Sequence, residues 1–397
     1  MTNAEIVALT DEHVMRTYGR LPLAFVRGEG CRLWDADGRT YLDFLAGISV
    51  VGTGHCHPRV VEAICRQAGT LMHTSNLFHI EPQARLAELL CANSCAEKVF
   101  FCNSGAEANE AAIKLVRKWA RLHKPPQARG IVTALNSFHG RTLATVTATG
   151  QEKYNKPFAP LPPGFSHVPY DDIDALAAAV DDKVCAVMLE PIIAEGGIIV
   201  PGEAYMRKVR ELCHERQVLL VLDEVQTGLG RTGKLFGYQH WGIEPDVFTL
   251  AKALGGGFPI GACLARGDAA TALEPGNHAS TFGGNHLACA AGEAALRVIL
   301  DEDLAGNAAA MGQRLREGLL AMRAAVPLVA GVRGRGLLLG LELSAPKGGE
   351  VEAACRERGL IVNKLSDDLL RLAPPLVLTA AEADEGLGIL REAMLSA

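Results

Sequence analysis

Four short apolar segments separated by helical patterns constrain the fold of this chain more than any other feature. They are GIVTAL (130–135), VCAVMLEPI (184–192), QVLLVLDEV (217–225) and PDVFTLA (245–251). Each has the length of a strand buried on both faces, and the stretches between them carry the apolar spacing of helices. Strands that alternate with helices predict a largely parallel sheet covered on both faces. In such a sheet, ligands bind beyond the carboxyl ends of the strands.

The remaining segments predict a second, smaller domain. Residues 24–45 suggest short strands around a turn at Asp37-Gly38. From about 286 the pattern returns to helices, followed by short strands such as GLLLGLEL. We therefore expect a large domain over 51–285, a small α+β domain over 286–397, and an N-terminal segment, 1–50, that packs with the small domain.

Composition and charge argue against several kinds of partner. The net charge of −6 provides no basic surface for nucleic acid, and no uncharged apolar run approaches the ~18 residues of a membrane helix. The N-terminus lacks a secretory signal, and the 11 cysteines are odd in number and scattered, which predicts a cytoplasmic protein with reduced thiols. His55-Cys56-His57 has no second cluster at zinc spacing, so we expect no metal site.

The lysine in FTLAKALGGGFPIGAC (248–263) has an unusual setting. Lys252 lies in an apolar run that leads into three consecutive glycines. Burial without a partner would lower the pKa of the amine, which suits covalent chemistry. Alternatively, the stem lies along apolar surface while the ammonium stays in water. The segment alone leaves both interpretations open.

A carboxylate stands at another strand end, in VLLVLDEVQTGLGRTGKL (218–235). Asp223 and Glu224 follow the apolar run directly. The glycines after them match two nucleotide-binding patterns in part, GxGxxG and GxxxxGK, both beginning at Gly228. A Rossmann motif ends the first strand of its unit, whereas this one follows a late strand. A P-loop has Ser or Thr after its lysine, and here that residue is Leu235. We interpret both matches as accidental.

Three further segments carry polar or aromatic residues. In FFCNSGAEANEAAIKL (100–115) a strand ends and a helix begins, which predicts either an anion site or an ordinary helix cap. NSFHGRTL places Phe138, His139 and Arg141 after another strand, and STFGGN offers two hydroxyls before glycines. Together with Asp223 and Lys252, these segments would suit a planar cationic heterocycle that bears a phosphate and an aldehyde.

The chain resembles the class III (fold type I) aminotransferases that use pyridoxal phosphate, and within that family the acetylornithine branch. The resemblance extends from TYGRLPLAF to RLAPPLV and is most specific in FFCNSGAEANEAAIKL, ALNSFHGRTLATVTATGQEKY, LDEVQTGLGRTG, LAKALGGGFPIGA and STFGGN. It implies an α/β fold in which the large domain has a mostly parallel seven-stranded sheet flanked by helices, beside a smaller α+β domain formed by the C-terminus and the N-terminal segment.

The resemblance implies roles for individual residues at the cofactor. Lys252 would hold pyridoxal 5'-phosphate covalently and act as general acid and base, and Asp223 would pair with the ring nitrogen. Gln226 would hydrogen-bond the phenolic oxygen, and Phe138 would stack on the ring. Thr281 would come from the second subunit, which implies an obligate homodimer with shared active sites. The implied cofactor-binding residues are Ser104, Gly105, Ala106, Phe138, Asp223, Val225, Gln226, Lys252 and Thr281.

The resemblance also implies transfer of the δ-amino group of N2-acetylornithine to 2-oxoglutarate. Arg141 would bind the distal carboxylate and Arg371 the α-carboxylate of glutamate, since a guanidinium fits a carboxylate bidentately. With acetylornithine bound, Glu195 would neutralise Arg371, because an unpaired buried cation is costly. Ser280 would contact acetylornithine.

Several alternatives stay open. Ile193-Ala194, Val51 and His286 depart from the family pattern, so succinylornithine, succinyl-diaminopimelate, ornithine and 4-aminobutyrate remain alternative substrates. A racemase or an aminomutase would use the same fold. Outside the family, residues 228–234 could serve a nucleotidase, and the helix start at 104–110 could serve a non-catalytic protein that binds an anionic metabolite.

Overall fold

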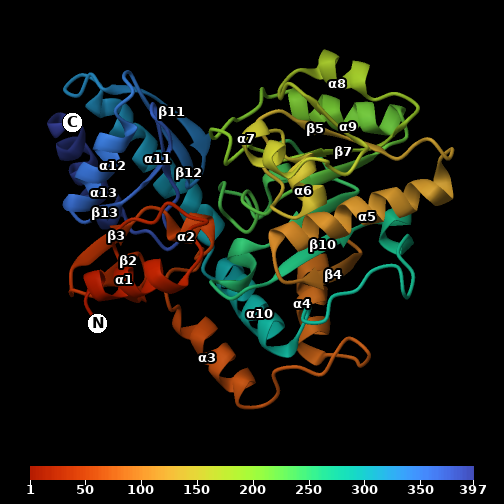
Figure 1. The fold of residues 1–397 in the computed structure, drawn as a ribbon, viewed down its shortest axis with the longest axis horizontal. Helices are drawn as coiled ribbons and strands as arrows, with labels where there is room; N and C mark the ends of the chain where they lie inside the picture. The colour runs from red at the N-terminus through yellow and green to blue at the C-terminus, as the bar shows by residue number, and fades with distance from the viewer.

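Residues 1–397 form three β-sheets with helices around them in the computed structural model. Figure 1 shows the largest sheet with its helices on one side of the molecule and the two smaller sheets on the other, where both chain termini also lie. None of the helices combines the length and the apolar character that crossing a membrane requires.

The largest sheet has seven strands in the order β4-β10-β9-β8-β7-β5-β6, and only β10 runs antiparallel to its neighbours. The prediction of a mostly parallel seven-stranded sheet beside a smaller α+β part is therefore confirmed. The strands are β4 (Lys98–Cys102), β5 (Gly130–Ala134), β6 (Phe165–Val168), β7 (Val184–Leu189), β8 (Leu219–Asp223), β9 (Val247–Leu250) and β10 (Gly261–Ala265).

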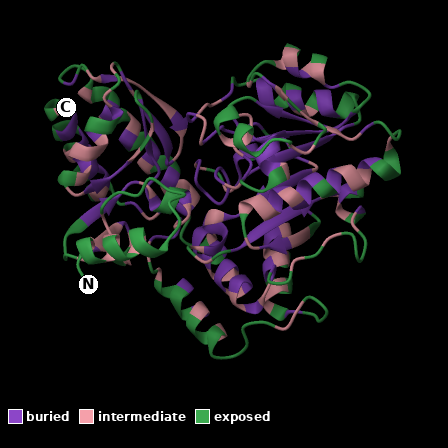
Figure 2. Ribbon diagram, viewed as in Figure 1, coloured by how far each residue is buried: buried purple, intermediate pink, exposed green.

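The central strands are almost entirely apolar because helices cover both of their faces. Alternate side chains of a strand point to opposite faces. In β7, Ala186 and Met188 pack in one apolar cluster with helix α5 (Gly105–His123), while Val187 and Leu189 pack in another with α9 (Tyr205–Glu215). Figure 2 shows this sheet buried between its helices.

The two smaller sheets join the ends of the chain. In the first sheet, β1-β2-β3-β13, the C-terminal strand β13 pairs in parallel with β3 through Leu360 and Leu42. The second sheet is antiparallel, with the order β11-β12-β15-β14. The strands are β1 (Phe25–Glu29), β2 (Arg32–Asp35), β3 (Thr40–Asp43), β11 (Val329–Arg335), β12 (Leu338–Leu343), β13 (Leu360–Ile361), β14 (Asn363–Ser366) and β15 (Leu369–Leu372).

Helix α10 packs on α3 and α4 and also on α11, so it connects the two sides of the molecule. Helix α1 buries none of its residues. The domain boundaries near residues 50 and 285 stay predictions. The other helices are α1 (Asn3–His13), α2 (Ala46–Ser49), α3 (Pro58–Ala68), α4 (Glu81–Ala92), α6 (Leu143–Ala148), α7 (Glu152–Asn155), α8 (Ile173–Ala179), α10 (His286–Asp301), α11 (Leu304–Met322), α12 (Gly348–Glu357) and α13 (Ala380–Ser396).

Candidate active site

A cavity of about 390 Å³ opens at the carboxyl ends of β4, β5, β7, β8 and β9. This is where a sheet of parallel strands gathers ligand-binding side chains from distant parts of the chain. The lining includes most of the predicted site residues, namely Ser104, Gly105, Ala106, Phe138, Arg141, Glu195, Asp223, Val225, Gln226 and Lys252. A groove of about 520 Å³ between α3, α4 and α10 is lined instead by charges that pair with one another.

Lys252 comes immediately after the buried strand β9 and Ala251, at the start of a short 3-10 turn. Its φ of +47° lies in the left-handed region, which residues other than glycine rarely adopt. Gly256 and Gly257 continue the turn with φ of +58° and +115°. The glycine run therefore allows the backbone to reverse directly behind the lysine, so that the amine stays in the cavity.

The surroundings of Lys252 lower the pKa of its amine to about 8. Burial has the largest effect, and the positive charge of Arg371 adds to it, whereas Glu195 and Asp223 act in the opposite direction. The side chain retains intermediate exposure because it borders the open cavity. The structure thus favours a reactive amine over a lysine whose ammonium reaches solvent.

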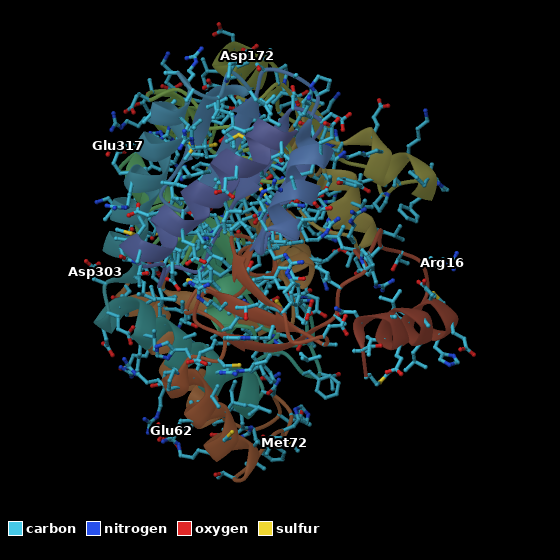
Figure 3. The ribbon with its side chains drawn as sticks, turned by 90° about the vertical axis from the view of Figure 1, so that its left-hand side faces the viewer. Arg16, Glu62, Met72, Asp172, Asp303 and Glu317 are labelled. Carbon is cyan, nitrogen blue, oxygen red and sulfur yellow. The ribbon has the colours of Figure 1, made fainter.

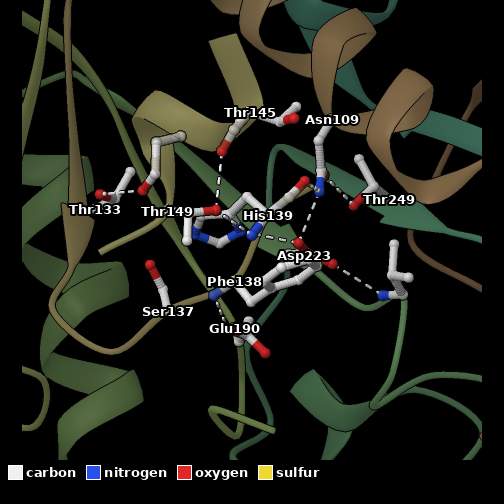
Figure 4. A network of polar contacts seen from close by, with 12 residues as sticks. Asn109, Thr133, Ser137, Phe138, His139, Thr145, Thr149, Glu190, Asp223 and Thr249 are labelled. Atoms are coloured by element: carbon white, nitrogen blue, oxygen red, sulfur yellow. Dashed lines mark hydrogen bonds and ion pairs between the residues drawn. The ribbon is translucent and has the colours of Figure 1, made fainter. Parts of the chain in front are cut away.

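Asp223 ends β8 as a buried carboxylate with every oxygen in use (Figure 4). Oδ2 accepts a hydrogen bond from Asn109 Nδ2 at 2.7 Å and lies 2.8 Å from His139 Nδ1. Oδ1 accepts from the Val225 N–H at 3.0 Å. Asn109 is held in turn by Thr249, whose hydroxyl donates to Oδ1 of Asn109 at 2.7 Å. The network holds a negative charge at one fixed point of the cavity.

The loop after β5 carries an aromatic ring and a cation into the cavity. The Phe138 N–H donates to Oε1 of Glu190 at 2.9 Å, and the Phe138 ring meets Tyr154 edge-on. The Arg141 guanidinium lies 4.0 Å above the Tyr154 ring and 5.3 Å from the Phe138 ring. No carboxylate lies within ion-pair distance of Arg141, so a cation is available for an anionic ligand.

Arg371 on β15 reaches the same site from the small domain and is only 1% exposed. Its Nη1 donates to Oε1 of Glu195 at 2.5 Å and to Oε1 of Gln226 at 3.2 Å, and its Nη2 donates to Asn363 at 2.8 Å. Gln226 also donates to Glu195 at 3.0 Å and accepts from the Ser49 hydroxyl at 3.2 Å. Burial is the largest single effect on the pKa of Glu195 and raises it, but the charges of Arg371 and Lys252 and the hydrogen bonds from Gln226 and Arg371 together lower the pKa below its ordinary value.

The start of α5 provides unpaired backbone donors. The Ser104 hydroxyl caps the helix by accepting from the Glu107 N–H, and the Glu107 carboxylate turns back to the backbone of Asn103. The N–H groups of Gly105 and Ala106, which line the cavity, have no partner within the protein. A helix N-terminus with free N–H groups favours an anion such as a phosphate.

These residues fit pyridoxal 5'-phosphate. Its phosphate matches the free N–H groups at the start of α5, and its ring nitrogen matches the fixed charge of Asp223. The aldehyde matches the amine of Lys252, and the Phe138 ring supplies a flat apolar face. A Cβ atom at residue 105 would lie 2.9 Å from the Val225 side chain, so only glycine fits at the start of α5 without displacing Val225.

Ser280 and Thr281 do not line the Lys252 cavity of their own chain. They border a separate cavity of about 610 Å³ on the other side of the end of β4. There the Ser280 hydroxyl accepts from Asn103 Nδ2 at 3.2 Å and from the Gly283 N–H at 3.0 Å, while Thr281 is exposed.

The glycine-rich segment 228–234 forms a turn that is followed by a short 3-10 helix, Gly237–His240, and not by the α-helix of a nucleotide-binding motif. Its Arg231 is 2% exposed and donates to the carbonyl of Leu337 at 3.0 Å and to that of Pro374. The segment thus ties the large sheet to the small domain, which explains the glycines without a nucleotide.

Several residues at the site lack a role in the sequence-based prediction. Asn109 and His139 hold the Asp223 carboxylate in place. Ser49 holds Gln226, and Asn363 holds Arg371. Glu190 follows β7 in the same way that Asp223 follows β8, so the rule of a carboxylate at a strand end would have found it.

Comparison with known proteins agrees with this geometry. The family model described as Aminotransferase class-III matches residues 14–394. An acetylornithine aminotransferase of Caldanaerobacter subterraneus subsp. tengcongensis is 51% identical over 98% of this chain and 99% of its own, and one of Gloeobacter violaceus is 54% identical over 96% and 95%. A Toxoplasma gondii ornithine aminotransferase structure with partial occupancy of pyridoxal phosphate aligns with a TM-score of 0.95 and 36% identity over 100% of this chain and 94% of its own.

Proposed function

The chain belongs to the class III aminotransferases, and we propose that it transfers the δ-amino group of N2-acetyl-L-ornithine to 2-oxoglutarate, giving N-acetyl-L-glutamate 5-semialdehyde and L-glutamate. This reaction is a step of arginine biosynthesis. The observation that carries the proposal is that the cavity of Lys252 is bordered by Glu195, whose carboxylate neutralises the adjacent buried cation Arg371. The 51% identity to an acetylornithine aminotransferase supports the same substrate.

The cofactor is pyridoxal 5'-phosphate. When bound, it withdraws electrons from the substrate carbon that bears the nitrogen, which makes the C–H bond there acidic. We propose that Lys252 binds its aldehyde, that Asp223 keeps the ring nitrogen protonated, and that Gln226 hydrogen-bonds the phenolic oxygen. The remaining residues proposed to hold it are Ser104, Gly105, Ala106, Phe138 and Val225, with Thr281 from a second copy.

We assign the proton transfers to Lys252. Its amine is the only lysine nitrogen that lines the cavity. A pKa of about 8 leaves a substantial fraction of neutral base near neutral pH, and the protonated form can return the proton to another atom.

Substrate choice rests on two arginines. Arg141 is free of carboxylates and suits the distal carboxylate of either substrate, while Arg371 suits the α-carboxylate of glutamate. Acetylornithine places no carboxylate at Arg371, so Glu195 keeps its present contact with that arginine. Glutamate requires Glu195 to leave. Ser280 is proposed to contact the acetylornithine end.

We propose further that two copies of the chain complete each site. Thr281 lies outside its own Lys252 cavity. Beside it, Phe282 is 61% exposed, and Leu77 and Phe78 are 87% and 66% exposed on a loop that is hydrogen-bonded to the 280–283 segment. Figure 3 shows Met72 of the same loop at the edge of the molecule. Contiguous exposed apolar side chains of this kind indicate a protein interface.

All 11 cysteines are free. This supports the proposal that the protein works in the reducing cytoplasm.

Steady-state kinetics with a panel of amines and 2-oxoglutarate test the proposed substrate. N2-acetylornithine should give a kcat/KM at least about tenfold above those of succinylornithine, succinyl-diaminopimelate, ornithine and 4-aminobutyrate, since a buried unmatched charge costs at least that much. A preference for another amine contradicts the substrate. Turnover of a single amine without a keto acid would indicate a mutase.

The Lys252→Ala variant tests the mechanism. Loss of the general base should lower kcat by roughly 10³-fold or more. A variant that completed both half-reactions at the normal rate would contradict the assignment.

A further inference from the structure

Glu190 is a buried carboxylate that the proposed reaction does not use. It follows β7 directly, is 4% exposed, and lines the Lys252 cavity. No lysine, arginine or histidine lies within ion-pair distance of it. Its partners are two backbone groups: Oε1 accepts from the Phe138 N–H at 2.9 Å, and Oε2 accepts from the Ala194 N–H at 3.1 Å. The first of these contacts is visible in Figure 4.

The two N–H groups belong to different functional segments. Phe138 lies on the loop that also carries Arg141, and Ala194 directly precedes Glu195. These segments lie against each other, since a side chain at Gly196 would be 2.0 Å from the carbonyl oxygen of Asn136. One carboxylate therefore joins the aromatic face of the cavity to the turn that carries the Arg371 partner.

A buried carboxylate at this position is energetically unfavourable, which a purely structural role does not explain. Burial and the nearby charge of Asp223 raise the pKa of Glu190 to about 7. A carboxylate nevertheless offers what no amide can, because each of its two oxygens accepts a hydrogen bond from a separate N–H. Locally unfavourable residues of this kind are expected at functional sites.

We propose that Glu190 is a positioning residue for substrate selection. Its two oxygens join the Phe138–Arg141 loop to the Glu195 turn, and this fixes the positions of the two carboxylate-binding sites, at Arg141 and Arg371, relative to each other. This inference rests on the proposed function. Anchoring the backbone at Ala194 lets the Glu195 side chain leave Arg371 for glutamate and return to the same place for acetylornithine.

Glu190→Gln tests the proposal, with Glu224→Gln as a matched control. Glu224 is also a buried carboxylate after a central strand and lies outside the cavity. It also accepts from two backbone N–H groups, those of Gly237 and Tyr238, and in addition from the Thr227 hydroxyl. Both variants lose one acceptor and should lower Tm similarly.

The two variants should differ in substrate selection. Glu190→Gln should raise KM for acetylornithine about tenfold and KM for glutamate less than about threefold, because both substrates use Arg141 but only acetylornithine also needs Glu195 on Arg371. It should also change the visible circular dichroism of the bound cofactor, which reports the contact between ring and Phe138. Glu224→Gln should change neither KM by more than about threefold. A Glu190→Gln protein that matched Glu224→Gln in both readouts would overturn the proposal.

Two further variants complete the experiment. In a Glu195→Gln background, Glu190→Gln should raise the KM for acetylornithine no further, whereas an additive rise would contradict action through Glu195. If Glu190→Gln does not fold, Glu190→Asp, which keeps both acceptors on a shorter stem, is measured in the same way with the same expected direction. The dichroism is recorded without substrate, so it tests Glu190 even if the panel identifies a different amine.

Discussion

At the scale of single residues, Lys252 combines two energetically unfavourable features. A left-handed backbone conformation and a partly buried amine both cost free energy. Proteins tolerate such features where the surrounding structure maintains them for function. Here β9 and the glycine turn hold the lysine in place.

The lowered pKa of Lys252 predicts a pH dependence of cofactor capture by the cofactor-free protein. The neutral amine reacts with the aldehyde, so the rate should rise with pH and level off above about 8 rather than near the ordinary lysine value of 10.5. Between these two pKa values the unfolded chain binds more protons than the native one, so this residue also makes stability rise with pH from about 8 to 10.5.

Stopped-flow absorbance of the protein mixed with pyridoxal phosphate, between about pH 6 and 10, measures this rate. Lys252→Ala serves as the control and should show no absorbance change of this kind. A rate that continued to rise steeply up to pH 10 would show that the amine is an ordinary solvated lysine.

The buried Arg371 predicts an asymmetric effect on the two half-reactions. Arg371→Gln removes the cation that we assign to the α-carboxylate of glutamate, so KM for glutamate should rise by at least about tenfold, with a smaller change for acetylornithine. The variant also leaves Glu195 without its ion-pair partner, which should cost about 3 kcal/mol of stability. Separate half-reaction titrations and Tm measure the two effects, and equal changes in both KM values would argue against the assigned role.

At the scale of elements, α2 is a left-handed turn. Ala46, Gly47, Ile48 and Ser49 have φ between +51° and +66°, which residues with side chains rarely adopt in succession. Asp43 holds the start of the turn: its Oδ1 accepts from the N–H groups of residues 45 and 46 at 2.8 and 2.9 Å. At the end of the turn, the Ser49 hydroxyl donates to the side-chain oxygen of Gln226, which also accepts from Arg371.

Asp43→Ala should therefore destabilise both the turn and the site. Loss of the acceptor leaves two backbone N–H groups without a partner, which should cost about 2–4 kcal/mol, and cofactor capture should weaken as Ser49 moves. Chemical denaturation and cofactor titration measure these effects. Asp37→Ala, on the exposed hairpin nearby, removes only exposed hydrogen bonds from Asn3, so it should lower stability by less than about 1 kcal/mol and leave cofactor capture within error. An Asp43→Ala protein with equally small effects would show that the turn does not need the Asp43 carboxylate.

At the scale of the whole molecule, the chain alone leaves Thr281 away from Lys252. If a second copy supplies Thr281, two inactive variants should complement each other. Lys252→Ala lacks the base, and Thr281→Asp places a negative charge where we expect the partner's phosphate. In a mixed dimer, one of the two sites has both residues intact, so the purified mixed dimer should recover about half of the wild-type activity per chain.

Co-expression of the two variants with different tags, followed by purification through both tags, measures this recovery. Each variant expressed alone is the control and should stay inactive. No recovery in a purified mixed dimer would mean that each chain supplies its own Thr281.

The sequence by itself determined the central strands and the positions of the reactive residues that follow them. Apolar runs of strand length predicted the central strands, and the residues directly after them, such as Asp223 and Lys252, were identifiable because parallel strands present their carboxyl ends at one edge. Local pattern is sufficient for such predictions, because the period of apolar residues and the glycine turns are encoded over a few neighbouring positions.

Only the tertiary structure decided which distant side chains meet. Asn109 reaches Asp223 across 114 positions, and Arg371 reaches Glu195 across 176. These contacts depend on a strand order, β9-β8-β7-β5, that departs from the order of the chain, and on β13 pairing with β3. A sequence records no such adjacency, because buried polar groups find partners according to space and not to chain position.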